Sequence, residues 1–235
     1  METKNIVITG ASRGIGRAVA ATFAAEGHTL FLTARNEVTL YNTVAELQTK
    51  YPAVTIKAKP ADLAIKEQVI EFGRWVNKQA TVDILVNNAG SFLPGSVHTE
   101  PDGTLEEMMT VNLYSAYHLT RVIVPAMIQK KSGHIFNLCS IASLKAYHNG
   151  GSYSISKFAL MGFSKNLREE LKAYNIKVSA VYPGAVLTDS WSGFDNSSKR
   201  IMEAEDIAAM ILSASKLSAA AVMEDIVLRP QLGDL

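Results

Sequence analysis

The strongest constraint on the fold is the regular alternation, along the whole chain, of short and mainly apolar segments with longer segments of helical period. Strands are predicted at 5–9, 29–33, 54–58, 84–86, 134–138, 177–181 and 224–228. Helices are predicted at 14–26, 37–50, 65–79, 104–130, 152–174 and 204–216. Several of the strands are apolar at nearly every position, which is typical of a parallel sheet that is buried on both faces. The sequence therefore predicts an α/β fold in which helices cover both faces of one parallel sheet.

Composition limits the class of protein. The chain has 235 residues, the length of one domain, and we expect a single domain spanning 1–235. A formal net charge of +1 excludes a polybasic nucleic-acid-binding protein, and a hydrophobic content of 48% excludes a disordered chain. The single cysteine, Cys139, excludes a disulfide framework and a cysteine-based zinc site. The five histidines show no ligand spacing, so no metal is expected.

No segment predicts export or insertion into a membrane. The first residues are charged and are followed by only a short apolar stretch, unlike a secretory signal. No apolar run reaches the length that spans a bilayer. We therefore expect a cytoplasmic protein without a membrane partner.

One long irregular stretch, residues 188–199, lies between the sixth predicted strand and the last predicted helix. It is rich in serine and aspartate, yet it contains Trp191 and Phe194. Loops of this length inside a compact domain are usually lids or binding loops. We predict a substrate lid at about 188–203; the alternative is an ordinary mobile surface loop.

The first predicted strand leads directly into the glycine-rich turn Thr9-Gly10-Ala11-Ser12-Arg13-Gly14-Ile15-Gly16, and then into a helix. Glycines let the backbone turn tightly and approach a pyrophosphate, and the start of the helix offers free N–H groups. The turn predicts a dinucleotide site formed by Gly10, Ser12, Arg13, Gly14, Ile15 and Gly16. A plain strand-to-helix turn also uses glycine, so the position after the first strand is what strengthens the prediction.

The end of the second predicted strand indicates which dinucleotide is bound. An acidic residue there would bind the ribose hydroxyl of NAD and repel a 2′-phosphate, but this chain has Arg35 in that region and no acid before Glu37. Arg35 and Arg13 could clamp a phosphate from two sides. We therefore expect NADP(H); the alternative is that both arginines are solvated surface charges.

A tyrosine and a lysine one helical turn apart, Tyr153 and Lys157, suggest acid–base chemistry. A free phenol has a pKa of about 10, which a neighbouring ammonium and an oxidised nicotinamide ring would lower. Alone, such a pair is usually an exposed helix face. The pair of Tyr153 and Lys157 becomes informative because of Ser140, which follows the fifth predicted strand. At that edge of the sheet its hydroxyl can hydrogen-bond a substrate carbonyl.

In order and spacing, these motifs resemble those of the short-chain dehydrogenases/reductases over the whole chain. They are Thr9-Gly10-x-x-x-Gly14-x-Gly16, Asn87-Asn88-Ala89-Gly90, Asn112, Ser140, Tyr153-x-x-x-Lys157 and Tyr182-Pro183-Gly184. The resemblance implies a Rossmann-type, doubly wound sheet of seven parallel strands in the order 3-2-1-4-5-6-7. It also implies that Tyr153 protonates the carbonyl, Ser140 orients it, Lys157 binds the nicotinamide ribose and Asn112 holds a water.

The same resemblance implies further cofactor contacts, in three groups. These are Asp62-Leu63 beside the adenine, Asn88-Ala89-Gly90 beside its ribose, and Pro183-Gly184-Ala185-Val186 with Thr188 at the nicotinamide half. It implies a homo-oligomer in which the helices at 104–130 and 152–174 form the dimer interface. The alternatives are structural: Asn88 and Asn112 could only stabilise strand and helix ends, and Asp62 could cap the following helix.

The expected function is NADPH-dependent reduction of a small-molecule carbonyl. Local features resemble bacterial sepiapterin reductases, at 132–136, 183–186, 205–208, 227–230 and 233–234. Asp189 and Asp234 are candidates to bind the guanidine-like edge of a pterin. A 3-oxoacyl thioester reductase acting on acyl carrier protein is one alternative. A catalytically silent, NADP(H)-sensing binding protein is the alternative from another class.

Overall fold

The computed structural model describes residues 2–191 and 193–234, so Met1 and Leu235 of the predicted domain and Ser192 of the predicted lid lie outside it. Seven parallel strands form one sheet in the order β3-β2-β1-β4-β5-β6-β7, which confirms the expected order. The strands are β1 (Asn5–Thr9), β2 (Thr29–Thr33), β3 (Ile56–Ala58), β4 (Ile84–Asn87), β5 (Gly133–Leu138), β6 (Ile176–Pro183) and β7 (Asp225–Leu228).

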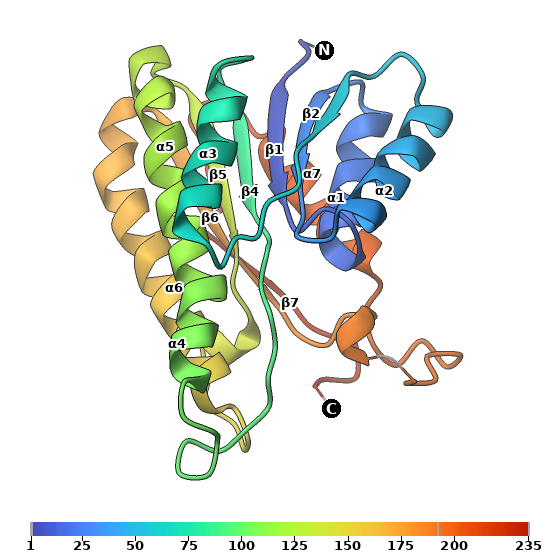
Figure 1. Ribbon diagram of the computed structural model, residues 1–235, viewed down its shortest axis with the longest axis vertical. Coiled ribbons are helices and arrows are strands. Elements are labelled where there is room, and N and C mark those ends of the chain that lie inside the picture. Colours follow the sequence, from blue (N-terminus) through green and yellow to red (C-terminus); the bar gives the residue numbers. More distant parts are fainter. Residues whose placement is uncertain (1, 192, 235) are drawn as a thin grey trace.

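Helices cover both faces of the sheet (Figure 1). One face carries α1 (Gly14–Ala25), α2 (Glu37–Lys50) and α7 (Ala204–Ser215). The other carries α3 (Lys66–Asn77), α5 (Ser115–Lys130) and α6 (Gly151–Leu171), with the short α4 (Thr104–Met109) preceding α5. Single-turn segments are η1 (Thr110–Tyr114), η2 (Ile141–Ser143), η3 (Lys172–Tyr174) and η4 (Asp189–Trp191).

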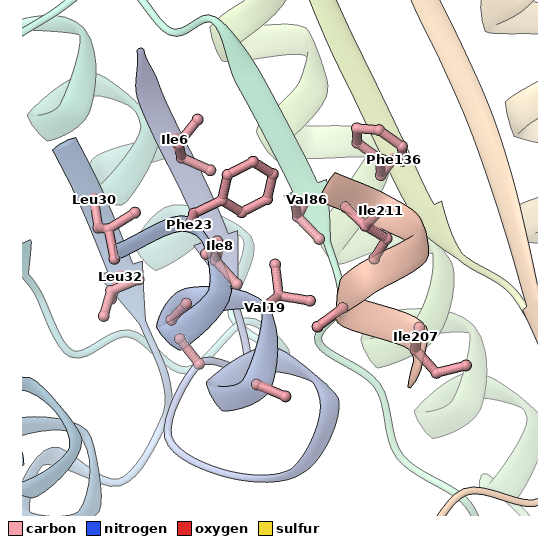
Figure 2. Packing of buried hydrophobic residues seen from close by; sticks show 14 of the residues in the cluster. Ile6, Ile8, Val19, Phe23, Leu30, Leu32, Val86, Phe136, Ile207 and Ile211 are labelled. Atoms are coloured by element: carbon pink, nitrogen blue, oxygen red, sulfur yellow. The ribbon is translucent and has the colours of Figure 1, made fainter. Parts of the chain in front are cut away.

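Strand β1 shows why the sheet is buried on both sides. Successive side chains of a strand point to opposite faces. Ile6 and Ile8 accordingly pack with Phe23 of α1, as Figure 2 shows, whereas Val7 between them packs into the cluster under α3 and α5. All of these side chains are fully buried, and each apolar side chain removed from water contributes about 1.5–3 kcal/mol. The two apolar clusters hold the sheet rigid between its helices.

The predicted helix at 104–130 is interrupted, which the helical period did not indicate. Residues Thr110–Tyr114 form a π-helical turn between α4 and α5. Such a turn inserts one residue into the helical repeat and is frequent at functional sites. Here it contains Asn112, whose buried side chain bonds to neighbouring elements. The π-helical turn thus coincides with the residue whose side chain bonds to the loop after β4 and to α6.

The predicted strand at 54–58 is also shorter than expected, because only Ile56–Ala58 pair with β2. Strands β1 and β2 and helix α2 have the predicted limits, and the remaining predicted strands and helices differ from the observed ones by a few residues at their ends. Among the helices that the structure describes, none has the length and apolar character needed to cross a bilayer.

Candidate active site

The predicted site residues gather at the carboxyl ends of four neighbouring strands. Gly10 follows β1, Asn88 follows β4, Ser140 lies two residues after β5, and Gly184 follows β6. These strands are adjacent in the parallel sheet, so their ends share one edge. In open α/β sheets this edge is where ligands bind, near the point at which the strand order reverses.

The glycine turn after β1 leaves no room for side chains. Gly10 and Gly14 have φ angles of +65° and +51°, which favour glycine. A Cβ on Gly16 would lie 2.2 Å from the carbonyl oxygen of Gly10. Helix α1 starts at Gly14, and its N-cap residue Arg13 makes no side-chain capping bond within the described chain. The free N–H groups and glycine-lined turn fit the pyrophosphate of a dinucleotide.

Asn88 ties the end of β4 to the glycine turn. Its Nδ2 donates to the carbonyl oxygens of Thr9, at 2.8 Å, and Gly10, at 3.2 Å. The Thr9 hydroxyl in turn accepts from the backbone N–H groups of Asn88 and Ala89, each at 2.9 Å. The side chain of Asn88 thus stabilises the ends of β1 and β4, the structural role that the sequence analysis gave as an alternative to cofactor binding. These bonds also place Ala89 and Gly90 beside the glycine turn.

Tyr153 and Lys157 lie one turn apart near the start of α6. The ammonium of Lys157 donates to the carbonyl oxygen of Leu138 at 2.8 Å and lies 5.8 Å from the centre of the Tyr153 ring. Ser140 precedes the single-turn segment η2, and its hydroxyl accepts from the backbone N of Ala142 at 3.1 Å. The ring of Phe92 meets the Tyr153 ring edge-on, with 4.8 Å between centroids.

Asn112 lies behind this group and joins it to the loop after β4. Its Oδ1 accepts from the backbone N of Ser91 at 2.8 Å, and its Nδ2 donates to the Ser156 hydroxyl at 2.9 Å. A Cβ on Gly90 would lie 2.9 Å from this Oδ1 and 3.5 Å from the Lys157 ammonium. The absence of a side chain at Gly90 therefore allows Asn112 and Lys157 to approach the same turn.

Burial shifts the pKa values of both key side chains away from charge. It raises the pKa of Tyr153 to about 12, although the Ser140 hydroxyl acts in the opposite direction. It lowers the pKa of Lys157 to about 8. In the cofactor-free protein the pKa of Tyr153 is therefore raised, because desolvation outweighs the hydrogen bond with Ser140. The ammonium of Lys157 is directed at the carbonyl oxygen of Leu138. The lowering expected with an oxidised nicotinamide ring bound stays a prediction. The phenol is protonated at neutral pH, the form that can donate a proton.

The two arginines predicted at a 2′-phosphate differ in their surroundings. Arg35 is exposed two residues beyond β2. Arg13 is also exposed, but it pairs with Asp189 at the start of η4. The carboxylate of Asp189 is thus engaged by an arginine, as is that of Asp234, which pairs with Arg229. The two carboxylates suggested for a pterin differ, however, because Arg229 engages only Oδ2 of Asp234, and its Oδ1 is buried without a hydrogen-bond partner among the described residues.

Asp62 and Leu63 precede α3. The Oδ1 of Asp62 accepts from the backbone N of Ala64 at 3.0 Å, which stabilises the turn. The N-cap of α3 is Ile65, so Asp62 does not cap that helix, contrary to the structural alternative for this residue. Leu63 is buried in the cluster under α3 and α5.

The segment after β6 closes on itself at its base. Val186 pairs with Met202, and the N–H of Leu187 donates to the Met202 carbonyl at 2.8 Å. Within the loop, the rings of Trp191 and Phe194 meet edge-on, with 5.3 Å between centroids. The first residues of this loop reach the glycine turn, where a Cβ on Gly14 would lie 3.1 Å from Thr188 Cγ2.

One contact of this region escaped the sequence analysis. Glu100, in the loop between β4 and α4, bonds to Ser152, the residue before Tyr153. The two residues are 52 positions apart. No periodicity or motif marks Glu100, so only the tertiary structure could bring it to the site.

The sequence is similar to known oxidoreductases over nearly its whole length. The family model described as short chain dehydrogenase matches residues 4–198. The chain is 33% identical to a protein named sepiapterin reductase from Chlorobaculum tepidum, over 98% of this chain and 97% of that protein. It is 29% identical to an uncharacterized oxidoreductase of Staphylococcus saprophyticus, over 98% of each chain.

Solved structures show the same similarity. A metagenomic short-chain oxidoreductase in complex with NADP superposes with a TM-score of 0.84 at 30% identity, over 97% of each chain. L-Sorbose reductase from Gluconobacter frateurii, complexed with NADPH and L-sorbose, superposes with a TM-score of 0.88 at 27% identity, over 97% of this chain and 95% of that one.

Proposed function

Since the chain belongs to the short-chain dehydrogenase family, we propose that this oxidoreductase is an NADPH-dependent carbonyl reductase with Tyr153 as its general acid. The observation that carries the proposal is the group formed by Tyr153, Ser140 and Lys157 at the carboxyl edge of the sheet. The protonated phenol of Tyr153 and the Ser140 hydroxyl lie close enough for the hydroxyl to influence the phenol pKa. A carbonyl oxygen that accepted from both would be oriented and polarised.

NADP(H) is the cofactor that these residues fit best. The glycine turn and the start of α1 would hold the pyrophosphate, and the exposed Arg35 would hold the 2′-phosphate. Arg13 would also bind the 2′-phosphate once its ion pair with Asp189 is broken. The other proposed contacts are Ser12, Ile15, Asp62, Leu63, Asn88, Ala89, Gly90, Tyr153, Lys157, Pro183, Gly184, Val186 and Thr188. The NADP and NADPH complexes of similar structures support this choice.

The division of roles follows from the site chemistry. When bound, NADPH supplies the hydride for the carbonyl carbon. Tyr153 donates a proton from its Oη to the carbonyl oxygen, while Ser140 stabilises the charge that develops there. Lys157, buried behind the phenol, favours the phenolate that remains after transfer. Asn112 keeps the turn at Ser91 in place beside this group and would hold the water through which the proton is replaced.

A planar or short apolar carbonyl compound is the proposed substrate class. Phe92 and Leu93 in the loop after β4, and Leu144 and Tyr147 in the segment after β5, are exposed and would offer an apolar and aromatic wall. The loop at about 188–203 would close over the substrate as a lid, with Trp191 and Phe194 as its aromatic contacts. The relative named sepiapterin reductase supports a pterin-like ligand.

We also propose a homo-oligomer whose interface is formed by the helices at 104–130 and 152–174, which correspond to α4 to α5 and to α6. Tyr114 in η1 and Ile155 and Phe158 in α6 are large apolar residues that remain exposed in the single chain. Because η1 and α6 contact each other, these residues could form one apolar surface, and such surfaces mark interfaces between protein chains. Analytical ultracentrifugation would test the oligomer, with Phe158→Glu expected to shift it toward the monomer.

The reaction is tested by NADPH oxidation in the presence of sepiapterin, small diketones and acetoacetyl thioesters. We expect turnover with at least one apolar ketone and a preference for NADPH over NADH. Preference for the thioester would favour the 3-oxoacyl thioester reductase instead. Tight NADPH binding without turnover of any of these compounds would contradict the proposed reductase and favour a sensor.

A further inference from the structure

The long loop between β4 and α4, residues 88–103, is fastened to the start of α6 (Figure 1). In Figure 1 this green loop and the segment that leads into α6 lie together at the lower end of the molecule. Glu100 makes the contact. Its Oε2 accepts from the backbone N of Ser152 at 3.2 Å, and its Oε1 accepts from the Ser152 hydroxyl. Ser152 is fully buried and Glu100 is half-buried, so this contact is partly shielded from water.

Helix α6 has no acidic group of its own for its first turn. Its N-cap residue is Gly150, which has no side chain, and its first turn contains no acidic residue. The N–H groups at the start of a helix lack acceptors within the helix, and a carboxylate placed there also interacts favourably with the helix dipole. Glu100 supplies the carboxylate from a distant part of the chain.

The backbones of the two segments approach closely around this carboxylate. Gly151 has a φ angle of +37°, and a Cβ there would lie 2.4 Å from the Gly95 carbonyl oxygen and 2.7 Å from Glu100 Oε2. The N–H of Gly95 donates to the Asn149 carbonyl at 3.1 Å, and the Ser96 hydroxyl donates to Asn149 Oδ1 at 2.7 Å. Residues 95–100 and 149–152 therefore form one hydrogen-bonded unit.

The same loop contacts the next residue of α6 as well. Phe92, at its beginning, meets the ring of Tyr153 edge-on, with an interplanar angle of 85°. Glu100, near its end, bonds to Ser152. The loop thus contacts Tyr153 directly, through the ring of Phe92, and indirectly, through the bond of Glu100 to the preceding residue, Ser152.

We propose that Glu100 is a positioning residue for the reaction, which fixes the first turn of α6 and thereby places the phenol of Tyr153 opposite the substrate carbonyl. The inference rests on the proposed function. Glu100 touches no reacting atom, and it acts through Ser152. Proton transfer depends steeply on geometry, and a displacement of about 1 Å can reduce the rate about 100-fold.

Kinetics of Glu100→Ala, Glu100→Gln and the control Glu106→Ala test the proposal. In Glu100→Ala, kcat should fall about 10- to 100-fold, while KM for NADPH changes less than about twofold. Glu100→Gln should recover to within about threefold of the original kcat, because its amide oxygen can still accept from the Ser152 N–H. Glu106 is exposed on α4, and its variant should be unchanged.

Three kinetic results would overturn the proposal. They are an unchanged kcat in Glu100→Ala, an equal loss of kcat and NADPH affinity, and a Gln variant as impaired as the Ala variant. If Glu100→Ala does not fold, Ser152→Ala and Gly151→Ala perturb the same contact from the helix side and should lower kcat with the same small effect on KM for NADPH.

Hydrogen exchange gives a readout that needs no substrate. In the Glu100→Ala protein, amides at 150–156 should exchange about fivefold faster, as expected on loss of a cap, whereas those at the end of α6 should not change. Unchanged exchange at 150–156 would overturn the proposal. Faster exchange in a protein that reduces no carbonyl would contradict only the proposed function.

Discussion

Replacing Lys157 by methionine should stabilise the cofactor-free protein at neutral pH while removing its activity. Burial lowers the pKa of Lys157 from 10.5 to about 8. At about pH 7 the side chain is charged in both the folded and the unfolded chain, so the folded state bears the full cost of burying the ammonium. A difference of about 2.5 pH units corresponds to about 3 kcal/mol. Methionine keeps the length of the side chain without the charge.

Part of this gain is lost with the hydrogen bond to Leu138. The carbonyl oxygen of Leu138 accepts from Lys157 at 2.8 Å, and leaving it without this donor costs about 1–2 kcal/mol. The free energy of unfolding of Lys157→Met should therefore exceed that of the original protein by about 1–2 kcal/mol at about pH 7. The wild-type value rises between about pH 8 and pH 10.5, because there the unfolded chain binds the proton that folded Lys157 has released. The advantage should have vanished by about pH 10.

Urea denaturation followed by circular dichroism measures this difference. The exposed Lys78→Met is the matched control, and it should show no such dependence on pH. A Lys157→Met protein that is less stable than the original at about pH 7 would refute the reasoning. So would a gain that persists undiminished at about pH 10. The expected combination of higher stability and lost activity is common for buried charges in active sites.

Three further predictions concern the cofactor, the core and the cysteine. Arg35→Ala should raise KM for NADPH about 10- to 100-fold and leave KM for NADH nearly unchanged, since only the 2′-phosphate contact is lost; an equal effect on both would contradict the assignment. Phe23→Ala should lower the free energy of unfolding by about 3–5 kcal/mol in urea, because Phe23 is fully buried; a loss below about 1 kcal/mol would contradict the packing. Cys139 should resist iodoacetamide in the folded protein, because burial raises its pKa to about 11; mass spectrometry would detect the modification that contradicts this.

The fold was predictable because its strands are apolar and their limits are marked by polar residues. Strands β1 and β2 have the predicted limits, since the apolar runs around Val7 and Phe31 are each buried on both faces. The π-helical turn around Asn112 was not predictable. Its helical period continues from α4 into α5, and the bonds that Asn112 makes within the turn reach Ser91 and Ser156, which are distant in sequence.

The residues of the candidate site were predictable from the sequence, but their pKa values and ion pairs were not. The positions of Tyr153, Lys157 and Ser140 followed from spacing, and the structure brings them together. The direction of the Tyr153 pKa shift did not follow, because desolvation is a property of the assembled site. The ion pair between Arg13 and Asp189 joins residues 176 positions apart, which no local pattern could reveal.

Turnover by Tyr153→Phe most directly tests the claim that this phenol supplies the proton. The variant keeps the ring, and so its contact with Phe92, but loses the Oη proton. With NADPH and the best ketone substrate, kcat should fall at least about 100-fold, as expected for loss of a general acid, while the Kd for NADPH stays within about twofold. A variant that retains most of its turnover would contradict the account, because the proton would then come from another group.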